Sequence, residues 1–155
     1  MLTNYIKKSG SSRNYYYKIM KNGKKKQISK EAYEKGKQQT KTKKMIEHVS
    51  EPWYTLISLG LKTVEGRRNK GKFKELAVGD IIEWKNDDFK PRSVQTRVIG
   101  KVFYPTFAAY LEGEGLQKCL PGMPSLEHGL SVYYKYYTKA DEAEFGVIAI
   151  QLALV

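Results

Sequence analysis

Positive charge is concentrated at one end of this chain, and that asymmetry divides it into two parts. Residues 1–44 carry fourteen lysines and arginines against two acids, a net charge of +12, whereas residues 45–155 carry fourteen residues of each sign and are neutral. We therefore expect a basic extension and linker at 1–44 and a compact domain at 45–155. A basic extension on a neutral domain favours a polyanionic partner, with nucleic acid first and an acidic membrane surface second.

The extension has its own local pattern. Tyr15–Ile19 reads as a short strand, Asn22-Gly23 as a tight turn and Lys25–Ile28 as the returning strand. A short helix is expected from Lys30 to Lys35 and a linker over residues 37–44. This hairpin has little to bury, and its tyrosines have no evident core to join. The residues expected to contact nucleic acid are Tyr15, Tyr16, Tyr17, Lys24, Lys25, Lys26, Lys43 and Lys44.

Several classes of protein are disfavoured by composition. One cysteine, Cys119, allows no internal disulfide, and together with His48 and His128 it cannot supply a multi-ligand zinc cluster. Cys119 is therefore expected to be a small buried side chain, and we expect neither a metal nor an organic cofactor. No apolar run reaches membrane-spanning length and the N-terminus lacks an apolar signal core, so we expect no membrane insertion and a reducing, cytoplasmic location.

The densest chemistry lies in the octapeptide G-L-K-T-V-E-G-R at residues 60–67. It reads as a turn that enters a strand. Strand alternation places Thr63, Glu65 and Arg67 on one face, and Lys62 stands at the mouth of the strand, where its long side chain reaches the same face. A carboxylate between two cations makes either a structural ion-pair cluster or a site for a polar, planar ligand.

The rest of the domain alternates strands with short helices. The expected strands are Met45–Val49, Ile81–Lys85, Ser93–Tyr104 and Val147–Val155. The expected helices are Glu51–Leu59 with Ser50 as its cap, Phe107–Leu111 with Thr106 as its cap, one that begins at Ser125, and one capped by Thr138 and Asp141. The apolar spacing of Leu126, Leu130, Tyr133, Tyr134 and Tyr137 favours the buried face of a helix over a surface that stacks on bases. Trp84 fits either the core or the wall of a cleft.

The order of these motifs resembles the ASCH family. The pattern G-x-K-x-x-E-x-R is followed by Leu76–Trp84, Tyr104-x-x-Phe107, Leu120-Pro121-Gly122 and Glu127–Leu130, and the likeness covers roughly residues 45–155. The resemblance implies an α+β fold, a PUA-like, mostly antiparallel β-barrel closed by the terminal strand, with helices packed on its outside. It also implies that the octapeptide lies in a cleft for RNA or a nucleotide. The lysine-rich extension resembles segments of large DNA virus proteins.

Three functions fit these residues. In a binding module, Lys62, Thr63, Glu65 and Arg67 would hold a nucleotide or RNA, with Glu65 accepting from an exocyclic amine and Arg67 donating to a carbonyl or phosphate. The alternative is a small hydrolase, either a ribonuclease or an amidohydrolase. Some ASCH proteins with a similar Gly-x-Lys-Thr deacetylate N4-acetylcytidine, using a threonine three residues after the lysine.

In this chain Glu65 occupies that position, so Lys62 and Glu65 together would have to activate water. The third function is a protein-interaction role in which the cluster only holds the barrel together. Among the three, the sequence favours the binding module, and whether the protein is an enzyme stays open.

Overall fold

The computed structural model describes residues 5–9, 14–20, 22–40 and 42–155. The chain divides into two compact units, Met1–Thr42 and Lys43–Val155. The second unit therefore includes Lys43 and Lys44, although the domain was expected to start at residue 45.

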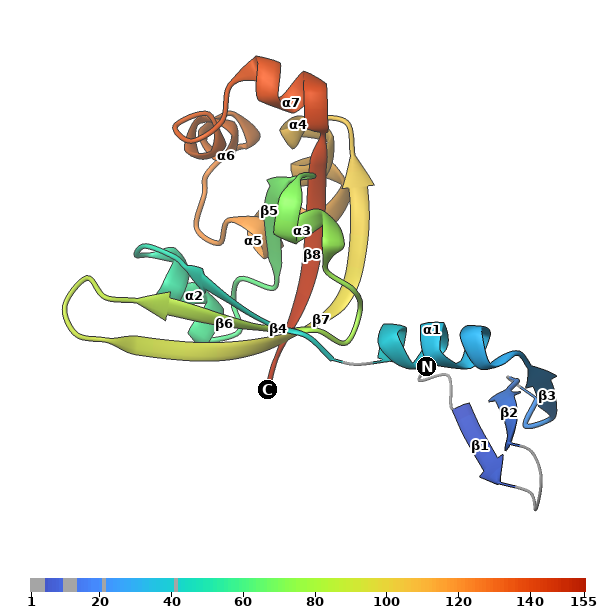
Figure 1. The fold of residues 1–155 in the computed structure, drawn as a ribbon. Helices are drawn as coiled ribbons and strands as arrows, with labels where there is room; N and C mark the ends of the chain where they lie inside the picture. The colour runs from blue at the N-terminus through green and yellow to red at the C-terminus, as the bar shows by residue number, and fades with distance from the viewer. Residues whose placement is uncertain (1–4, 10–13, 21, 41) are drawn as a thin grey trace. The chain divides into compact units, whose positions relative to one another are not determined.

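The first unit is a three-stranded antiparallel sheet with one helix (Figure 1). Its strands are β1 (Tyr5–Ser9), β2 (Asn14–Ile19) and β3 (Lys25–Ile28), in that spatial order, and its helix is α1 (Lys30–Thr40). The predicted hairpin is confirmed by the β2–β3 pairing and by the bond from Met20 N–H to the Lys24 carbonyl, 2.8 Å. Strand β1 was not predicted.

Helix α1 is longer than expected, because tertiary packing overrides the helix-ending tendency of Gly36. The helix passes through Gly36 and reaches Thr40, where a linker was predicted. Gly36 is buried three residues after Tyr33, whose side chain is only 4 % exposed. The Tyr33 ring lies 4.8 Å from the Tyr16 ring, centroid to centroid. The interpretation that the extension's tyrosines have no core to join is therefore wrong for Tyr16.

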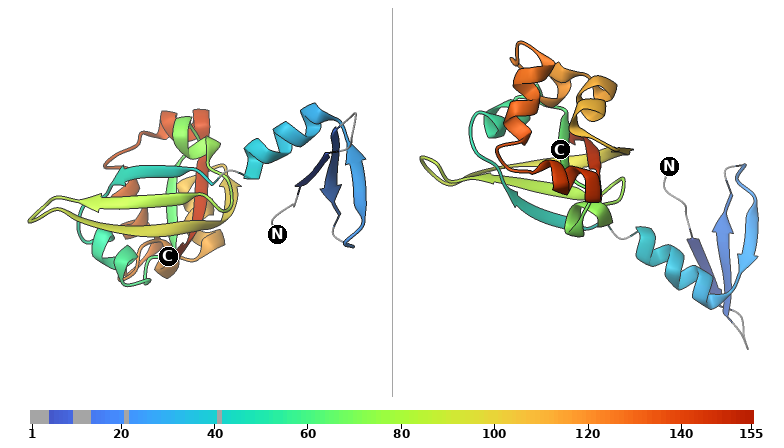
Figure 2. Two further views of the ribbon diagram at one scale, coloured as in Figure 1. Left: turned by 60° about the horizontal axis from the view of Figure 1, so that its bottom comes forward. Right: turned by 90° about the horizontal axis from the view of Figure 1, so that it is seen from above.

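The second unit is built on a curled five-stranded sheet (Figures 1 and 2). Its spatial order is β4 (Lys44–His48), β6 (Ile81–Asn86), β7 (Arg92–Tyr104), β8 (Val147–Leu154) and β5 (Val64–Arg68). Only the β4–β6 pair is parallel, so the predicted mostly antiparallel α+β fold is confirmed.

Strand β7 makes the curl possible. Its first part, Arg92–Arg97, pairs with β6, and its part from Thr96 onward pairs with β8. Within the β7–β8 pairing, the register shifts between Val98 and Gly100. Such a bulge bends a strand and increases its twist. The terminal strand β8 lies inside the sheet rather than closing it, and across the described residues β4 and β5 remain as two unpaired edges. The sheet is therefore a half-barrel, open between β4 and β5.

Short helices cover this half-barrel: α2 (Trp53–Ser58), α3 (Gly71–Glu75), α4 (Phe107–Glu114), α5 (Leu116–Cys119), α6 (Leu126–Tyr133) and α7 (Lys139–Phe145). The caps predicted at Thr106, Ser125 and Thr138 are confirmed, but the one predicted at Ser50 is wrong, because α2 begins after Pro52 and has no side-chain cap bond. The side chains of Thr106 and Ser125 accept from backbone N–H groups of the first turns of α4 and α6. Thr138 and Asp141 form a reciprocal capping box at the start of α7.

Two apolar clusters pack against opposite faces of the sheet, as the alternation along β8 shows. Val147 and Ala149 contact the cluster around Phe107 and Tyr110, whereas Ile148 and Ile150 belong to the cluster around Trp84. Trp84 is thus a core residue, fully buried, and its Nε1 donates to Thr96 Oγ1 at 2.9 Å. On β5, Val64 faces the first cluster while Glu65 and Arg67 face the other way.

We predict that Gly66→Ala lowers the free energy of unfolding by about 1–3 kcal/mol, because the new methyl group overpacks a buried site. A Cβ at Gly66 would lie 2.5 Å from the buried ring of Tyr110. Gly100→Ala is the matched control, since its Cβ would meet only the amide end of Gln151, which is able to rotate away. Urea unfolding measures both variants, and a Gly66→Ala protein as stable as the Gly100→Ala protein would contradict this packing.

Candidate functional site

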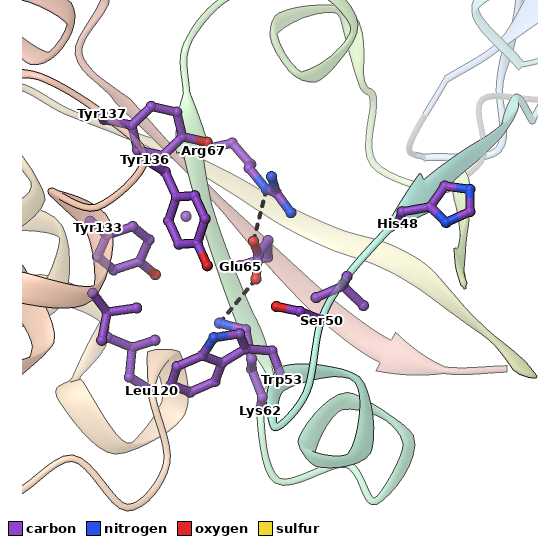
Figure 3. Close-up of a pocket in the computed structure, with 13 residues that line it drawn as sticks. His48, Ser50, Trp53, Lys62, Glu65, Arg67, Leu120, Tyr133, Tyr136 and Tyr137 are labelled. Atoms are coloured by element: carbon purple, nitrogen blue, oxygen red, sulfur yellow. Dashed lines mark ion pairs between the residues drawn. The ribbon is translucent and has the colours of Figure 1, made fainter. Parts of the chain in front are cut away.

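A cavity of about 280 Å³ lies where the half-barrel is open (Figure 3). Part of its wall comes from the end of β4 with the two residues after it, and from β5 with Lys62 just before it. The rest comes from α2, from Leu120 just after α5 and from the region around the end of α6. The lining residues are His48, Val49, Ser50, Trp53, Lys62, Glu65, Gly66, Arg67, Leu120, Val132, Tyr133, Tyr136 and Tyr137. The cavity is slightly smaller than most pockets for small organic ligands, which span about 300–1,000 Å³.

The Lys62 side chain is almost fully buried, with 3 % of the residue exposed. Its Nζ donates to the Val64 carbonyl at 3.0 Å and to the Cys119 carbonyl, and lies 3.0 Å from Glu65 Oε2. An ammonium group has three N–H donors and no acceptor, so these three oxygens occupy all of its donors. The Lys62 side chain is consequently fixed by contacts on all sides of its terminal nitrogen.

Glu65 lies between Lys62 and Arg67, and Figure 3 draws its ion pairs with these two residues as dashed lines. Its Oε2 faces Lys62, and its Oε1 lies 2.8 Å from Arg67 Nε. Burial by itself would raise the pKa of the Glu65 carboxyl, but the charges of Lys62 and Arg67 and their hydrogen bonds outweigh burial and lower it. The cavity therefore contains a carboxylate that stays ionised at neutral pH.

Arg67 connects the two open edges of the sheet. Its Nε faces Glu65 without pointing its N–H squarely at the oxygen, and its Nη1 lies 3.8 Å from Glu47 Oε1 on β4. Burial would lower the pKa of Arg67, but nearby Glu65, Tyr137 and Glu47 raise it, so the guanidinium remains charged. Lys72 forms a second ion pair with Glu47. The two strands are thus linked by side chains where no backbone pairing exists.

Aromatic side chains form much of the remaining wall. Trp53 comes from α2 and has its ring 5.7 Å from Lys62 Nζ. Tyr133, Tyr136 and Tyr137 come from the end of α6 and the turn that follows it. Tyr136 is 68 % exposed and stands at the rim, whereas Tyr133 is buried and its hydroxyl lies 3.2 Å from that of Tyr110. Burial raises the pKa of Tyr133, which keeps its hydroxyl protonated.

The structure brings together three of the four predicted octapeptide ligands, namely Lys62, Glu65 and Arg67. Thr63 is not in the cavity wall; its backbone N–H donates to the Lys118 carbonyl and its carbonyl accepts from Leu152 N–H. Core packing of the α6 tyrosines is confirmed, because Tyr133 is in the core and its predicted neighbours pack against it. Helix α6 ends at Tyr133, however, so Tyr137 reaches the core from a turn.

The residues expected to contact nucleic acid from outside the octapeptide are spread over both units. Lys25 and Lys26 lie exposed on β3, Lys24 lies exposed in the preceding turn, and Tyr15 and Tyr17 lie with Tyr16 on β2. In the second unit, Lys43 N–H donates to Asp80 Oδ1 at 2.8 Å, and Lys44 Nζ forms an ion pair with Glu83 at 2.8 Å.

The described residues offer neither a metal site nor a membrane-spanning helix. No three histidine, cysteine, aspartate or glutamate side chains gather there in a way that would hold a metal ion. Within the same residues, every helix is too short or too polar to cross a bilayer. The lone cysteine, Cys119, is a free thiol in the apolar core, as predicted, and burial raises its pKa to about 11.

The second unit is a small α+β domain, a curled half-barrel with an ion-pair cavity at its open side. The model of the ASCH domain family matches residues 48–155, so this chain belongs to the ASCH family. The extension at 1–44 lies outside that match, and its likeness to viral segments stays a prediction.

Two solved structures share the fold at 32 % identity. The crystal structure of hypothetical protein PH0355 aligns with a TM-score of 0.66 over 72 % of this chain and 99 % of that one. The solution NMR structure of protein PF0455 from Pyrococcus furiosus aligns with a TM-score of 0.59 over 74 % and 97 %. No protein of curated function matches this chain.

We predict that Glu65→Gln destabilises the protein by about 3 kcal/mol at pH 7, because it leaves the buried cation of Lys62 and the partly buried cation of Arg67 beside a neutral amide. A loss of about 3 kcal/mol is at the low end of the range for breaking a buried ion pair, because Lys62 keeps its two carbonyl acceptors. The folded-state pKa of Glu65 lies below the ordinary value of 4.5. The wild-type advantage is therefore complete above pH 4.5 and is lost as the pH falls through the folded-state pKa.

Urea unfolding of both proteins between pH 7 and pH 3 checks this. Glu112→Gln is the control, since Glu112 is exposed on α4 and does not line the cavity. A difference between wild type and Glu65→Gln that stays constant down to pH 3 would show that Glu65 is not a carboxylate with a lowered pKa.

Proposed function

We propose that this ASCH domain binds an unpaired nucleobase, from RNA or a nucleotide, in the cavity between β4 and β5. One observation carries the proposal: an ionised carboxylate, Glu65, is held between two cations inside an aromatic-walled cavity. A nucleobase is a planar ligand that offers an aromatic face together with donors and acceptors along its edge, and such a cavity meets both demands.

Each part of the cavity has a role in this proposal. Glu65 accepts from an exocyclic amine or ring N–H, and Arg67 donates to a carbonyl or to the attached phosphate. Lys62 acts indirectly, since its three donors are already engaged and it fixes the orientation of Glu65. Trp53 and Tyr136 provide the aromatic surfaces against which the base stacks.

The hydrolase alternative has weaker support from the geometry. A lysine that acts as a nucleophile or base needs a free lone pair, and the Lys62 ammonium donates to three oxygens. A carboxylate with a lowered pKa is also a poor general base for water. Among the described residues of the cavity wall, Glu65 is the only acid, so no second carboxylate assists it.

Tyr136→Ala tests base binding without disturbing the core, since Tyr136 is 68 % exposed. Loss of one stacking surface is worth about 1–3 kcal/mol, so we expect roughly a fivefold to hundredfold weaker affinity. Calorimetry with the four ribonucleoside monophosphates, with N4-acetylcytidine and with a mixed-sequence single-stranded RNA measures it. Phe89→Ala is the control, since Phe89 is 90 % exposed at the β6–β7 turn and does not line the cavity.

Wild-type protein that binds none of these ligands, or binds them as well after Tyr136→Ala, would contradict the proposal. Mass spectrometry of the same mixtures tests hydrolysis. If the protein is a hydrolase, the wild type and Phe89→Ala would convert N4-acetylcytidine to cytidine, and a folded Lys62→Met variant would not. That result would show that the protein is an enzyme and would contradict the binding-module proposal.

The basic extension is proposed to add sequence-independent affinity through contacts with phosphates. Changing Lys24, Lys25 and Lys26 to Gln in the full chain should reduce the slope of log affinity against log salt by about 2, since each lost phosphate contact on a single strand contributes about 0.7. The matched control removes three charges elsewhere, with Lys90→Gln, Arg97→Gln and Lys118→Gln. Equal slopes for the two triple variants would exclude this role.

A further inference from the structure

Positive charge also gathers at one place in the second unit, although residues 45–155 as a whole are neutral. Residues 67–74 read R-R-N-K-G-K-F-K and hold five cations and no acid. This segment begins in β5 and continues into α3. We propose that its part from Arg68 to Lys74, the Arg68–Lys74 track, binds the phosphates of a single-stranded nucleic acid whose base occupies the cavity, a proposal that rests on the function proposed above.

The track is held firmly in place by three elements. Asn69 N–H donates to the Gly146 carbonyl at 3.1 Å. Phe73 packs against the core cluster around Trp84. Lys101 Nζ, from β7, donates to the carbonyls of Lys74 at 2.9 Å and Leu76 at 2.6 Å, which fixes the end of α3. A segment ordered before binding loses less conformational entropy when a ligand arrives.

Two lysines of the track carry charge that no acid among the described residues neutralises. Arg68 forms an ion pair with Asp141 at 2.5 Å, and Lys72 pairs with Glu47. Across the described residues, Lys70 and Lys74 have no acidic partner, and both are exposed. Lys70 Nζ lies 4.2 Å from the centre of the Phe145 ring. Lys70 and Lys74 are therefore the point charges most available to phosphates.

The track starts at the cavity wall. Arg67, the residue immediately before it, lines the cavity and shares Glu47 with Lys72. The Arg68 guanidinium lies 5.2 Å from the ring of Tyr137, which also lines the cavity. Figure 1 shows α3 beside β5, and Lys72 and Lys74 lie on α3. Arg68 and the lysines that follow it are therefore the next cations along the chain from the cavity wall.

This arrangement favours a single strand over a duplex. A base within a cavity is neither paired nor stacked on its neighbours, and extracting it from a duplex costs a few kcal/mol. The ribose and the flanking phosphates stay outside the cavity, where a row of cations contributes affinity through release of counterions. The track reads no sequence, because its contacts are with phosphates.

The test compares short and long ligands on the full chain. Lys70→Gln/Lys74→Gln should bind a nucleoside monophosphate as wild type does, but should bind a single-stranded RNA octamer of the same base roughly tenfold or more weakly at 0.1 M salt. Its salt slope should fall by about 1.4, from two lost phosphate contacts. The double variant Lys90→Gln/Lys118→Gln removes the same charge away from the track and should keep more of the wild-type slope.

The possible outcomes separate this inference from the proposed function. If the monophosphate binds and the two double variants have equal octamer affinities and equal salt slopes, the role of the Arg68–Lys74 track is wrong. The proposed base-binding cavity is unaffected by that result. Failure of wild type to bind both the monophosphate and the octamer overturns the two proposals together. A duplex that competes as well as the single strand of the same sequence overturns the assignment to single strands.

Discussion

The geometry of the second unit depends on the buried carboxylate of Glu65. An isolated charge in this position would be very costly, and it is tolerated because two cations and their hydrogen bonds surround it. The cation on one side, Lys62, also binds the carbonyl of Cys119 and so connects β5 to α5. The cation on the other side, Arg67, faces Glu47 and so connects β5 to β4. Glu65 thereby holds three walls of the cavity in one arrangement.

Much of the fold could be predicted because its determinants are local. Strand alternation and the caps at Thr106, Ser125 and Thr138 require only neighbouring residues, and these elements were predicted nearly at their observed bounds. The length of α1 could not be predicted, because Gly36 continues the helix only when it is buried. The open side of the half-barrel was also missed, since it depends on β8 pairing with both β5 and β7, far apart in the chain.

The difference between local and long-range determinants also explains which residues of the site could be predicted. Lys62, Glu65 and Arg67 were predicted because one octapeptide contains them all. Trp53 and Tyr136 were missed as cavity residues, since they arrive from α2 and from a turn more than sixty residues beyond the octapeptide. Tyr133 and Tyr137 were predicted as core residues and do pack there, but periodicity indicates only that a side chain is buried. It does not reveal that the same ring also faces a cavity.

The open side between β4 and β5 has a consequence for how the domain moves. A closed barrel widens only when backbone hydrogen bonds between its strands break together. Here the links across the gap include the ion pairs of Glu47 with Arg67 and with Lys72, which are side-chain contacts. Widening this side therefore requires ion pairs to separate but no strand ladder of the sheet to break. Salt screens the half-exposed Lys72–Glu47 pair most and so favours this widening.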